Sequence, residues 1–175
     1  VHAQTADARH QRDRDDAPKE FEEVVINIDR VARVVKGGRR FRFKALVVVG
    51  NRKDKVGVGV AKGQDVQTAI SKATDVAKKN LIIIPLYKDT IPHDSETRIS
   101  GAHVLIKPAA PGTGIIAGGV IRQIIGVTGI RNMLSKSLGS TNKVNIAYAT
   151  IKALSSLVPR DQWVGVEKKS KRGTK

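Results

Sequence analysis

The sequence predicts an α+β protein with two small α/β domains flanked by two disordered tails. Stretches in which β-branched residues alternate with charged residues indicate strands, and stretches in which Ala, Val and Ile recur every three or four residues indicate helices. A turn-rich segment at residues 88–93 separates two groups of such elements. The expected order is β-β-β-α before this boundary and β-β-α-β-α after it.

The first domain, expected at residues 21–87, opens with two long strands at 24–35 and 39–49. Gly37 and Gly38 between them indicate a hairpin turn, because glycine accepts positive φ. A turn made of these two residues would place Arg33 opposite Arg42. Because side chains alternate between faces along a strand, we expect a basic face and an apolar face. The basic face contains Arg33, Arg40, Arg42 and Lys44, and the apolar face contains Ala32, Val34, Phe41, Phe43 and Ala45.

A cationic turn at residues 51–55 and a third strand at 56–61 follow. Gly57 and Gly59 leave one face of this strand nearly bare, a pattern that often marks the close approach of another backbone. Residues 65–79 have helical spacing, and residues 81–86 form a short strand interrupted by Pro85. The apolar side of the helix contains Val66, Ala69, Ile70, Ala73, Val76 and Ala77.

The second domain is expected at residues 94–158. Its elements are a hairpin of strands 95–99 and 102–107, a Gly/Pro/Ala loop at 108–119, a short apolar helix at 119–127, a strand at 130–138 and a final helix. Thr141 or Asn142 would cap this last helix, and Pro159 would stop it. Residues 1–20 are predicted to be a disordered extension and residues 159–175 a basic tail, in which Trp163 caps a core or an interface.

The composition favours a polyanionic partner. The 175-residue chain has a formal net charge of +16 and a pI of about 10.4, which favours nucleic acid. An anionic lipid surface is the weaker option, because the sequence has neither a long apolar span nor an amphipathic basic helix with aromatic anchors. The chain has no cysteine, which excludes disulfides and thiolate chemistry. We find no catalytic arrangement and no histidines at metal-ligand spacing, so we expect a protein that is not an enzyme and has no metal or cofactor.

A dense group of cations lies between residues 30 and 62, where Asp54 is the only acid. A solvated sheet face is the simpler reading, but so many unpaired cations would repel one another. Phosphate-backbone binding explains them better, because arginine can grip a phosphate at two points. The small number of aromatic residues favours helical RNA over single strands. The predicted RNA-binding residues are Arg30, Arg33, Lys36, Gly37, Gly38, Arg39, Arg40, Arg42, Lys44, Arg52, Lys53, Lys55 and Lys62.

The loop at residues 108–119 looks like a phosphate-cradling loop before a helix. However, no Lys-Ser/Thr pair follows its glycines, as a Walker A motif would require. A small-molecule kinase-like enzyme would also need a carboxylate near the loop, and the sequence has none from Arg98 to Leu138. The favoured interpretation is a tight loop followed by a helix that approaches a neighbour closely.

Two separated blocks of the sequence resemble one known family. The first comprises residues 38–51 (GRRFRFKALVVVGN), 56–63 (VGVGVAKG) and 69–70, and the second comprises 112–119 (GTGIIAGG), Arg122 and 139–142 (GSTN). Their order and spacing resemble the family of bacterial-type small-subunit ribosomal protein S5 (uS5), over residues 20–158.

This resemblance implies an N-terminal domain like a double-stranded-RNA-binding domain (dsRBD) and a C-terminal domain with a left-handed crossover. It implies a structural ribosomal protein that binds 16S-type rRNA, supports assembly of the small (30S) subunit and contributes to decoding fidelity. Expected partners are ribosomal proteins S4 and S8, and mRNA where it enters the subunit. The expected location is a cytoplasmic ribosome, with an organellar ribosome as the alternative. A free-standing double-stranded RNA-binding protein is the rival function. The expected protein-interface residues are Gly112, Thr113, Gly114, Gly118, Gly119 and Arg122.

Overall fold

The computed structural model describes residues 21–163. The predicted extension at 1–20 and the part of the predicted tail at 164–175 lie outside this range. The described residues form two four-stranded sheets, three α-helices and a short 3-10 helix. The chain completes the first sheet and its helix before it enters the second sheet, as the predicted division into two α/β units requires.

The first sheet is antiparallel and has the strand order β1-β2-β3-β4. Its strands are β1 (Glu22–Val35), β2 (Gly38–Gly50), β3 (Lys55–Gly63) and the very short β4 (Ile82–Ile83). Helix α2 (Val66–Lys79) follows β3, and the hydroxyl of Thr68 in its first turn accepts a hydrogen bond from the backbone N–H of Asp65 at 3.2 Å. Each of these elements lies within a few residues of its predicted position.

The second sheet has the order β5-β6-β8-β7. The predicted hairpin is present as β5 (Ser95–Ile99) and β6 (Ala102–Pro108), and β8 (Met133–Gly139) pairs with β6. Strand β7 (Ile115–Ile116) lies within the segment predicted as a loop, and it runs parallel to β8 through the crossover helix α3 (Gly119–Gly126). Two residues are too few to produce an alternating pattern, which is why the sequence did not predict this strand.

Helix α4 (Lys143–Ser155) starts after Asn142, whose side-chain oxygen accepts a hydrogen bond from the backbone N–H of Val144 at 3.1 Å. This contact identifies Asn142 as the cap, where the sequence left Thr141 as an alternative. The helix ends before Pro159. The 3-10 helix η1 (Arg160–Gln162) then leads to Trp163, whose ring is partly exposed and lies beside His93, with 6.1 Å between ring centroids.

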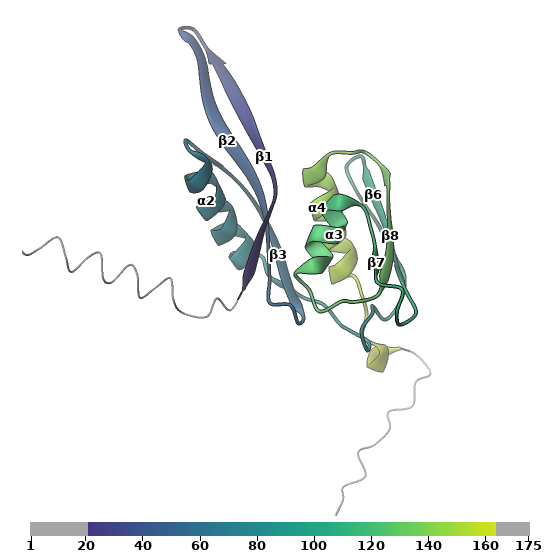
Figure 1. The fold of residues 1–175 in the computed structure, drawn as a ribbon. Coiled ribbons are helices and arrows are strands. Elements are labelled where there is room, and N and C mark those ends of the chain that lie inside the picture. Colours follow the sequence, from purple (N-terminus) through teal and green to yellow (C-terminus); the bar gives the residue numbers. More distant parts are fainter. Residues whose placement is uncertain (1–20, 164–175) are drawn as a thin grey trace, which may run out of the picture.

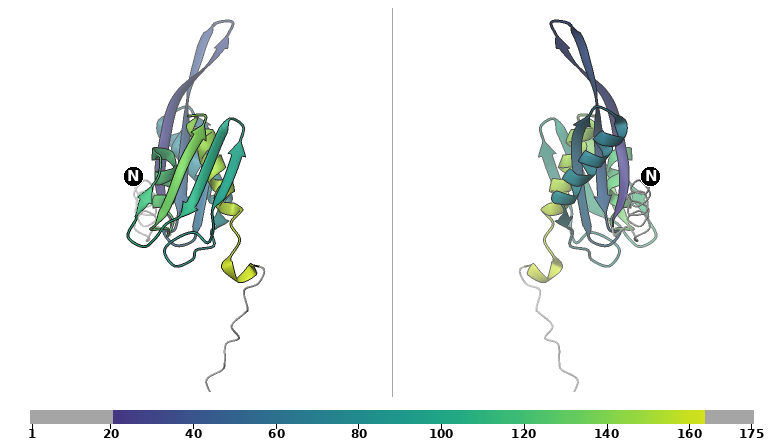
Figure 2. Two further views of the ribbon diagram at one scale, coloured as in Figure 1. Left: turned by 90° about the vertical axis from the view of Figure 1, so that its right-hand side faces the viewer. Right: turned by 90° about the vertical axis from the view of Figure 1, so that its left-hand side faces the viewer.

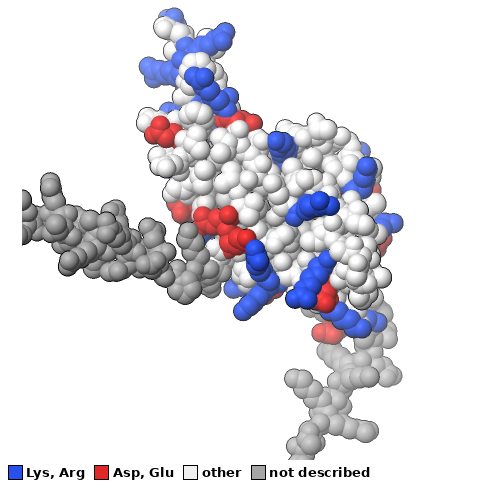
Figure 3. Space-filling model, in the orientation of Figure 1, with Lys and Arg blue, Asp and Glu red and all other residues white. Residues whose placement is uncertain are grey.

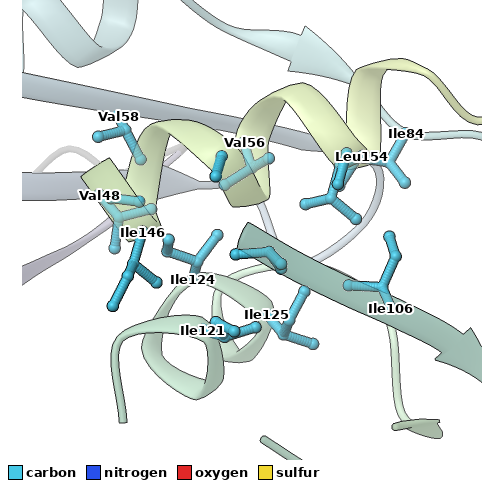
Figure 4. Close-up of a cluster of buried hydrophobic side chains, with 14 of the residues drawn as sticks. Val48, Val56, Val58, Ile84, Ile106, Ile121, Ile124, Ile125, Ile146 and Leu154 are labelled. Atoms are coloured by element: carbon cyan, nitrogen blue, oxygen red, sulfur yellow. The ribbon is translucent and has the colours of Figure 1, made fainter. Parts of the chain in front are cut away.

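The elements stack in four layers, visible edge-on in Figure 1 and from both sides in Figure 2. Helix α2 covers one face of the first sheet, and α3 and α4 lie between the other face and the second sheet. One continuous core therefore joins the two units: Leu46 and Val48 of β2 belong to the same buried cluster as Ile124 of α3 and Leu154 of α4 (Figure 4). The sequence predicted two domains but not this shared core.

The prediction that another backbone approaches Gly57 and Gly59 is confirmed. A Cβ atom at Gly59 would lie 2.1 Å from the carbonyl oxygen of Ala73, and one at Gly57 would lie 2.3 Å from that of Ala77. Helix α2 therefore packs with its backbone almost directly on β3. The buried alanines of its inner face, Ala69, Ala73 and Ala77, allow the same close contact from the helix side.

The predicted hairpin register is wrong by two residues. Val35 pairs with Gly38, so Lys36 and Gly37 form the turn, and Arg33 lies opposite Arg40 instead of Arg42. Gly38 has a φ of +132° and Gly37 does not have a positive φ. Either glycine could have supplied the unusual conformation, so the sequence did not fix the turn. A shift of two residues leaves every side chain on its original face, and the predicted basic and apolar faces are therefore unchanged.

Candidate nucleic-acid interface

The free end of the β1–β2 hairpin extends beyond the rest of the sheet. Strand β3 stops pairing with β2 at Phe43 and Gly63, so residues 30–43 form a two-stranded ribbon, which projects at the top of Figure 1. The ribbon contains six cations and no Asp or Glu. Figure 3 shows Lys and Arg side chains at this end, with acidic groups only toward its base. We call residues 30–43 the basic ribbon.

One face of the basic ribbon concentrates positive charge. Arg33 lies directly opposite Arg40, and Val31 lies opposite Arg42. Like charges opposite each other repel, and a bound anion would relieve this repulsion. The same face has a hollow of about 480 Å³. The cations that line it are Arg33, Arg40, Arg42 and Lys62.

The other face combines cations with exposed apolar side chains. The guanidinium carbon of Arg30 lies 3.8 Å from the centroid of the Phe41 ring, a cation–π contact that orients the Arg30 side chain. Arg39 lies opposite Val34. Phe41 is 48% exposed and Val34 is 74% exposed, so this face also has uncovered apolar area.

An ion pair marks the base of the ribbon. The amino group of Lys44 lies 2.8 Å from the carboxylate of Asp29, and the side-chain amide of Asn27 donates a second hydrogen bond to the same carboxylate. The Lys44 contact, aided by Asn27, lowers the pKa of Asp29. Lys44 therefore already has a carboxylate partner, unlike the arginines farther along the ribbon.

The other predicted RNA-binding cations lie at the far end of β2. Arg52 and Lys53 belong to the β2–β3 turn and Lys55 begins β3, whereas the hairpin tip lies at the other end of β2, twelve residues from Gly50 along an extended strand, roughly 40 Å. The side-chain oxygen of Asn51 accepts hydrogen bonds from three backbone N–H groups of this turn. The structure thus divides the basic segment of the sequence into two separate sites.

Arg52 is held by a carboxylate. Its Nε and Nη2 donate hydrogen bonds to the two carboxylate oxygens of Glu22, at 2.5 and 2.7 Å. This contact lowers the pKa of Glu22 and raises that of Arg52. Lys53 is exposed and has no carboxylate partner among the ion pairs of the described residues. An open groove of about 600 Å³ lies beside it, and its charged lining residues are Arg52, Lys53, Asp54, Lys88, Asp89 and Arg131.

The glycine loop has little capacity left for a phosphate. The side-chain oxygen of Asn132 accepts hydrogen bonds from the backbone N–H groups of Gly112 and Gly114, at 3.1 and 3.0 Å. These amides are the groups that a phosphate-binding loop would direct at its ligand. Sequence reasoning missed Asn132, because nothing in its neighbourhood in the chain connects it with the loop. Apart from the adjacent backbone, no described atom lies within 4 Å of a Cβ placed at Gly118 or Gly119, and both glycines are exposed, so the surface after the loop is bare.

Two further functions find no support in the described part of the chain. Within residues 21–163, no three His, Cys, Asp or Glu side chains are grouped so that they could hold a metal ion. The helices of this region include none that is long and apolar enough to cross a membrane.

The fold and the basic ribbon define an α+β protein with a projecting cationic surface. Residues 21–85 match the family "Ribosomal protein S5, N-terminal domain", and residues 97–163 match "Ribosomal protein S5, C-terminal domain". The chain is 54% identical to small ribosomal subunit protein uS5 of Campylobacter jejuni (strain 81-176) over 139 residues, which are 79% of this chain and 95% of the relative. It is 51% identical to the protein of that name from Pseudothermotoga lettingae over 140 residues, 80% of this chain and 79% of the relative.

The chain belongs to the ribosomal protein S5 (uS5) family. The predicted family is confirmed, and so is the prediction that the chain is not an enzyme, because the relatives are named as components of the ribosome. The alternative of a kinase-like enzyme is therefore wrong. The C-terminal match also extends to residue 163, five residues past the predicted end of the second domain.

Proposed function

We propose that the chain is a structural protein of the small ribosomal subunit, whose basic ribbon binds the phosphate backbone of 16S-type rRNA and supports subunit assembly. The observation that carries this proposal is the accumulation of six cations without a carboxylate on a projecting two-stranded ribbon. Each phosphate that such a surface neutralises releases counterions, so affinity falls as salt rises.

Helical RNA suits this surface better than stacked single-stranded bases. Single-strand binders use exposed aromatic rings as platforms for bases, but the ribbon has only Phe41 and Phe43. Arg30 already covers one face of Phe41, and Phe43 is partly buried. The ribbon would therefore recognise the shape and backbone of an RNA helix, as is usual for double-stranded RNA.

We assign protein contacts to the bare surface around the glycine loop. The supporting observations are the open space at Gly118 and Gly119 and the exposure of Ile116, which is 54% exposed. Gly112, Thr113, Gly114 and Arg122 complete this surface, which would contact the neighbouring ribosomal proteins S4 and S8. A contribution to decoding fidelity would act through these contacts.

The second basic site is our candidate for a contact with mRNA where it enters the subunit. Lys53 and Lys55 lie at the end of the sheet opposite to the ribbon, so a contact there would be independent of the rRNA contact. Lys53 lines the open groove beside Lys88, and an extended nucleic acid strand could lie along such a groove. The pairing of Arg52 with Glu22 makes Arg52 the weakest member of this set.

A charge-reversal experiment tests the proposed function. Arg39→Glu, Arg40→Glu and Arg42→Glu, combined in one variant, should prevent co-sedimentation with small subunits at physiological salt. A matched control reverses three exposed lysines of α2 and α4 and changes the net charge equally: Lys72→Glu, Lys79→Glu and Lys152→Glu.

The control variant should still join the subunit, and thermal unfolding should show that both variants are folded. If the ribbon variant joined small subunits as well as the unmodified chain, the assignment of the ribbon would be wrong. If the unmodified chain bound double-stranded RNA but never travelled with small subunits, the free-standing RNA-binding function would replace this proposal.

A further inference from the structure

A β-bulge near the base of the basic ribbon changes which residues of β1 face the second unit. Val25 pairs with Val47 and Asn27 pairs with Leu46, so Ile26 is an extra residue in β1. Because side chains alternate along a strand, one extra residue reverses the alternation beyond it. Leu46 belongs to the core that α3 and α4 share, and Ile26 packs against this core. The bulge therefore places Asn27, the partner of Leu46, on the side of the sheet where α4 lies.

A network of four polar side chains connects α4 to both strands at this point. The amino group of Lys143 donates a hydrogen bond to the side-chain oxygen of Asn27 at 2.6 Å, although the two residues are 116 positions apart in the chain. The side-chain amide of Asn27 donates to the carboxylate of Asp29 at 2.6 Å, and Lys44 of β2 lies 2.8 Å from the same carboxylate. We call Asn27, Asp29, Lys44 and Lys143 the junction network.

Lys143 occupies an unfavourable position for its own helix. It is the first residue of α4, and the first turn of this helix contains no acidic residue. A helix N-terminus carries partial positive charge, so a cation there is repelled. The position is favourable only for the contact with β1. Lys44 and Asn27 lower the pKa of Asp29, and the charge of Lys143 adds to this effect. A residue that breaks a local rule in this way indicates a role in the tertiary structure.

The basic ribbon magnifies any movement at its base. In the described part of the chain it has no third strand beyond Phe43 and Gly63, and it projects from the body of the protein as two strands (Figure 1). It is about 17–20 Å long from Phe43 to the turn, at about 3.3–3.4 Å per residue. A rotation of about 10° at the base would therefore displace the tip by about 3 Å. This displacement is as large as a hydrogen-bond length, so it is sufficient to break a polar contact at the tip.

We propose that the junction network sets the direction in which the basic ribbon projects, with Asn27 and Lys143 as its positioning residues. Ile146 and Leu154 anchor α4 in the shared core, so the start of this helix is a fixed point. Lys143 and Asn27 connect that fixed point to the base of the ribbon. A ribbon that is held in one direction loses less conformational entropy when it meets a rigid partner. The network belongs to the free protein, so this proposal does not depend on rRNA binding.

Spin labels on pairs of introduced cysteines measure the direction of the ribbon in the free, full-length chain, which has no cysteine of its own. Val34→Cys labels the exposed part of the ribbon, and Leu138→Cys labels β8 in the second unit. Double electron–electron resonance gives the distribution of distances between the two labels. This distribution should be narrow when the network is intact. Asn27→Ala and Lys143→Met should each shift or widen it by about 3 Å, the displacement expected for a rotation of about 10°.

Two controls separate the direction of the ribbon from general effects on the fold. Lys152→Met removes an exposed cation from the other end of α4 and should leave the ribbon distance unchanged. Ser71→Cys on α2, paired with Leu138→Cys, reports the arrangement of the two units without the ribbon, and Lys143→Met should leave this distance unchanged. Thermal unfolding of Lys143→Met should show little change in Tm, because the lost contact is offset by the removal of a cation from a helix N-terminus.

An unchanged ribbon distance in both Asn27→Ala and Lys143→Met would overturn the proposal. An equal change in the distance from Ser71→Cys to Leu138→Cys would also overturn it, because the network would then hold the two units together instead of directing the ribbon. Neither result bears on the proposed rRNA binding, which the charge-reversal variants test by co-sedimentation.

A salt titration of rRNA binding gives a second measurement, which rests on the proposed function. Asn27→Ala removes no cation, so the slope of log affinity against log salt should stay the same. The affinity itself should fall, by about 2- to 10-fold if the ribbon points in the bound direction only half to a tenth of the time. A reduced slope would indicate lost phosphate contacts. Either a reduced slope or an unchanged affinity would overturn the role of the network in binding.

Discussion

Replacing Gly59 with alanine should strongly destabilise the protein, although strand propensity alone predicts the opposite. Glycine in a strand interior is less favourable than alanine by roughly 0.5–1 kcal/mol. In the structure, however, the new Cβ would lie 2.1 Å from the carbonyl oxygen of Ala73 and 2.6 Å from the backbone nitrogen of Ala77. Ordinary contacts begin near 3.4 Å, so α2 would have to move away from β3 by more than 1 Å.

Such a displacement would weaken the packing of the whole inner face of α2, because the opposing atoms belong to the helix backbone and cannot turn aside. Overpacking costs about 1–3 kcal/mol and sometimes more, and a gap of 0.5–1 Å already loses a quarter to a half of a contact's dispersion energy. We expect a loss of about 3 kcal/mol, which corresponds to a fall in Tm of roughly 6–12 °C for a chain of this size.

Urea and thermal unfolding of the isolated protein measure this loss. Gly126→Ala is the matched control, because Gly126 is exposed at the end of α3, lacks a positive φ and, apart from its own helix backbone and chain neighbours, has no described atom within 4 Å of its Cβ position. Gly126→Ala should be neutral or stabilising by up to about 1 kcal/mol. A Gly59→Ala protein as stable as the unmodified chain would refute the close backbone packing of α2 on β3.

Three further substitutions test the hairpin turn, the glycine loop and the ion pair at the ribbon base. Gly38→Ala should cost about 1–3 kcal/mol because of its positive φ, whereas Gly37→Ala should be close to neutral in urea unfolding; equal effects would contradict the observed turn. Asn132→Ala leaves two loop amides without an acceptor and should cost about 1–3 kcal/mol, while Asn132→Asp retains the acceptor and should lose less. Because Lys44 lowers the pKa of Asp29 in the folded state, the pair stabilises the protein above the unfolded-state pKa of about 4 and this contribution is lost as the pH falls through the folded-state pKa. Urea unfolding between about pH 2 and 6 should show that Asp29→Asn lacks this pH-dependent part of the free energy of unfolding. The difference should be less than about 1 kcal/mol, because the pair is partly exposed. If the pH profile were unchanged, the pair would contribute nothing to stability.

Local patterns were sufficient for most elements. The alternation of charged and apolar residues predicted the faces of β1 and β2, and the spacing of Ala69 and Ala73 predicted α2. The bareness of Gly57 and Gly59 even predicted a close backbone neighbour, which is a tertiary feature. These predictions succeeded because each depends on side chains a few residues apart on one element.

Features that depend on distant partners could not be predicted. The turn register depended on which of two glycines takes the positive φ, and Asn132 meets Gly112 and Gly114 only because β8 passes beside the loop. The core that joins the two units also depends on residues that are distant in the chain. Leu46 and Val48 look like ordinary buried strand residues, and only the tertiary structure shows that they pack against α3 and α4.

The basic segment shows how the contributions of sequence and structure differ. The sequence by itself determined that the chain is strongly cationic, that its cations gather between residues 30 and 62, and that it is a member of the S5 family by its motifs. The tertiary structure decided which of these cations act together. An extended strand carries its two ends far apart, so the arginines of the ribbon and Lys53 of the β2–β3 turn, close in the chain, face different surroundings. The sequence gives the total charge of the chain, whereas binding depends on where the fold places the charged side chains.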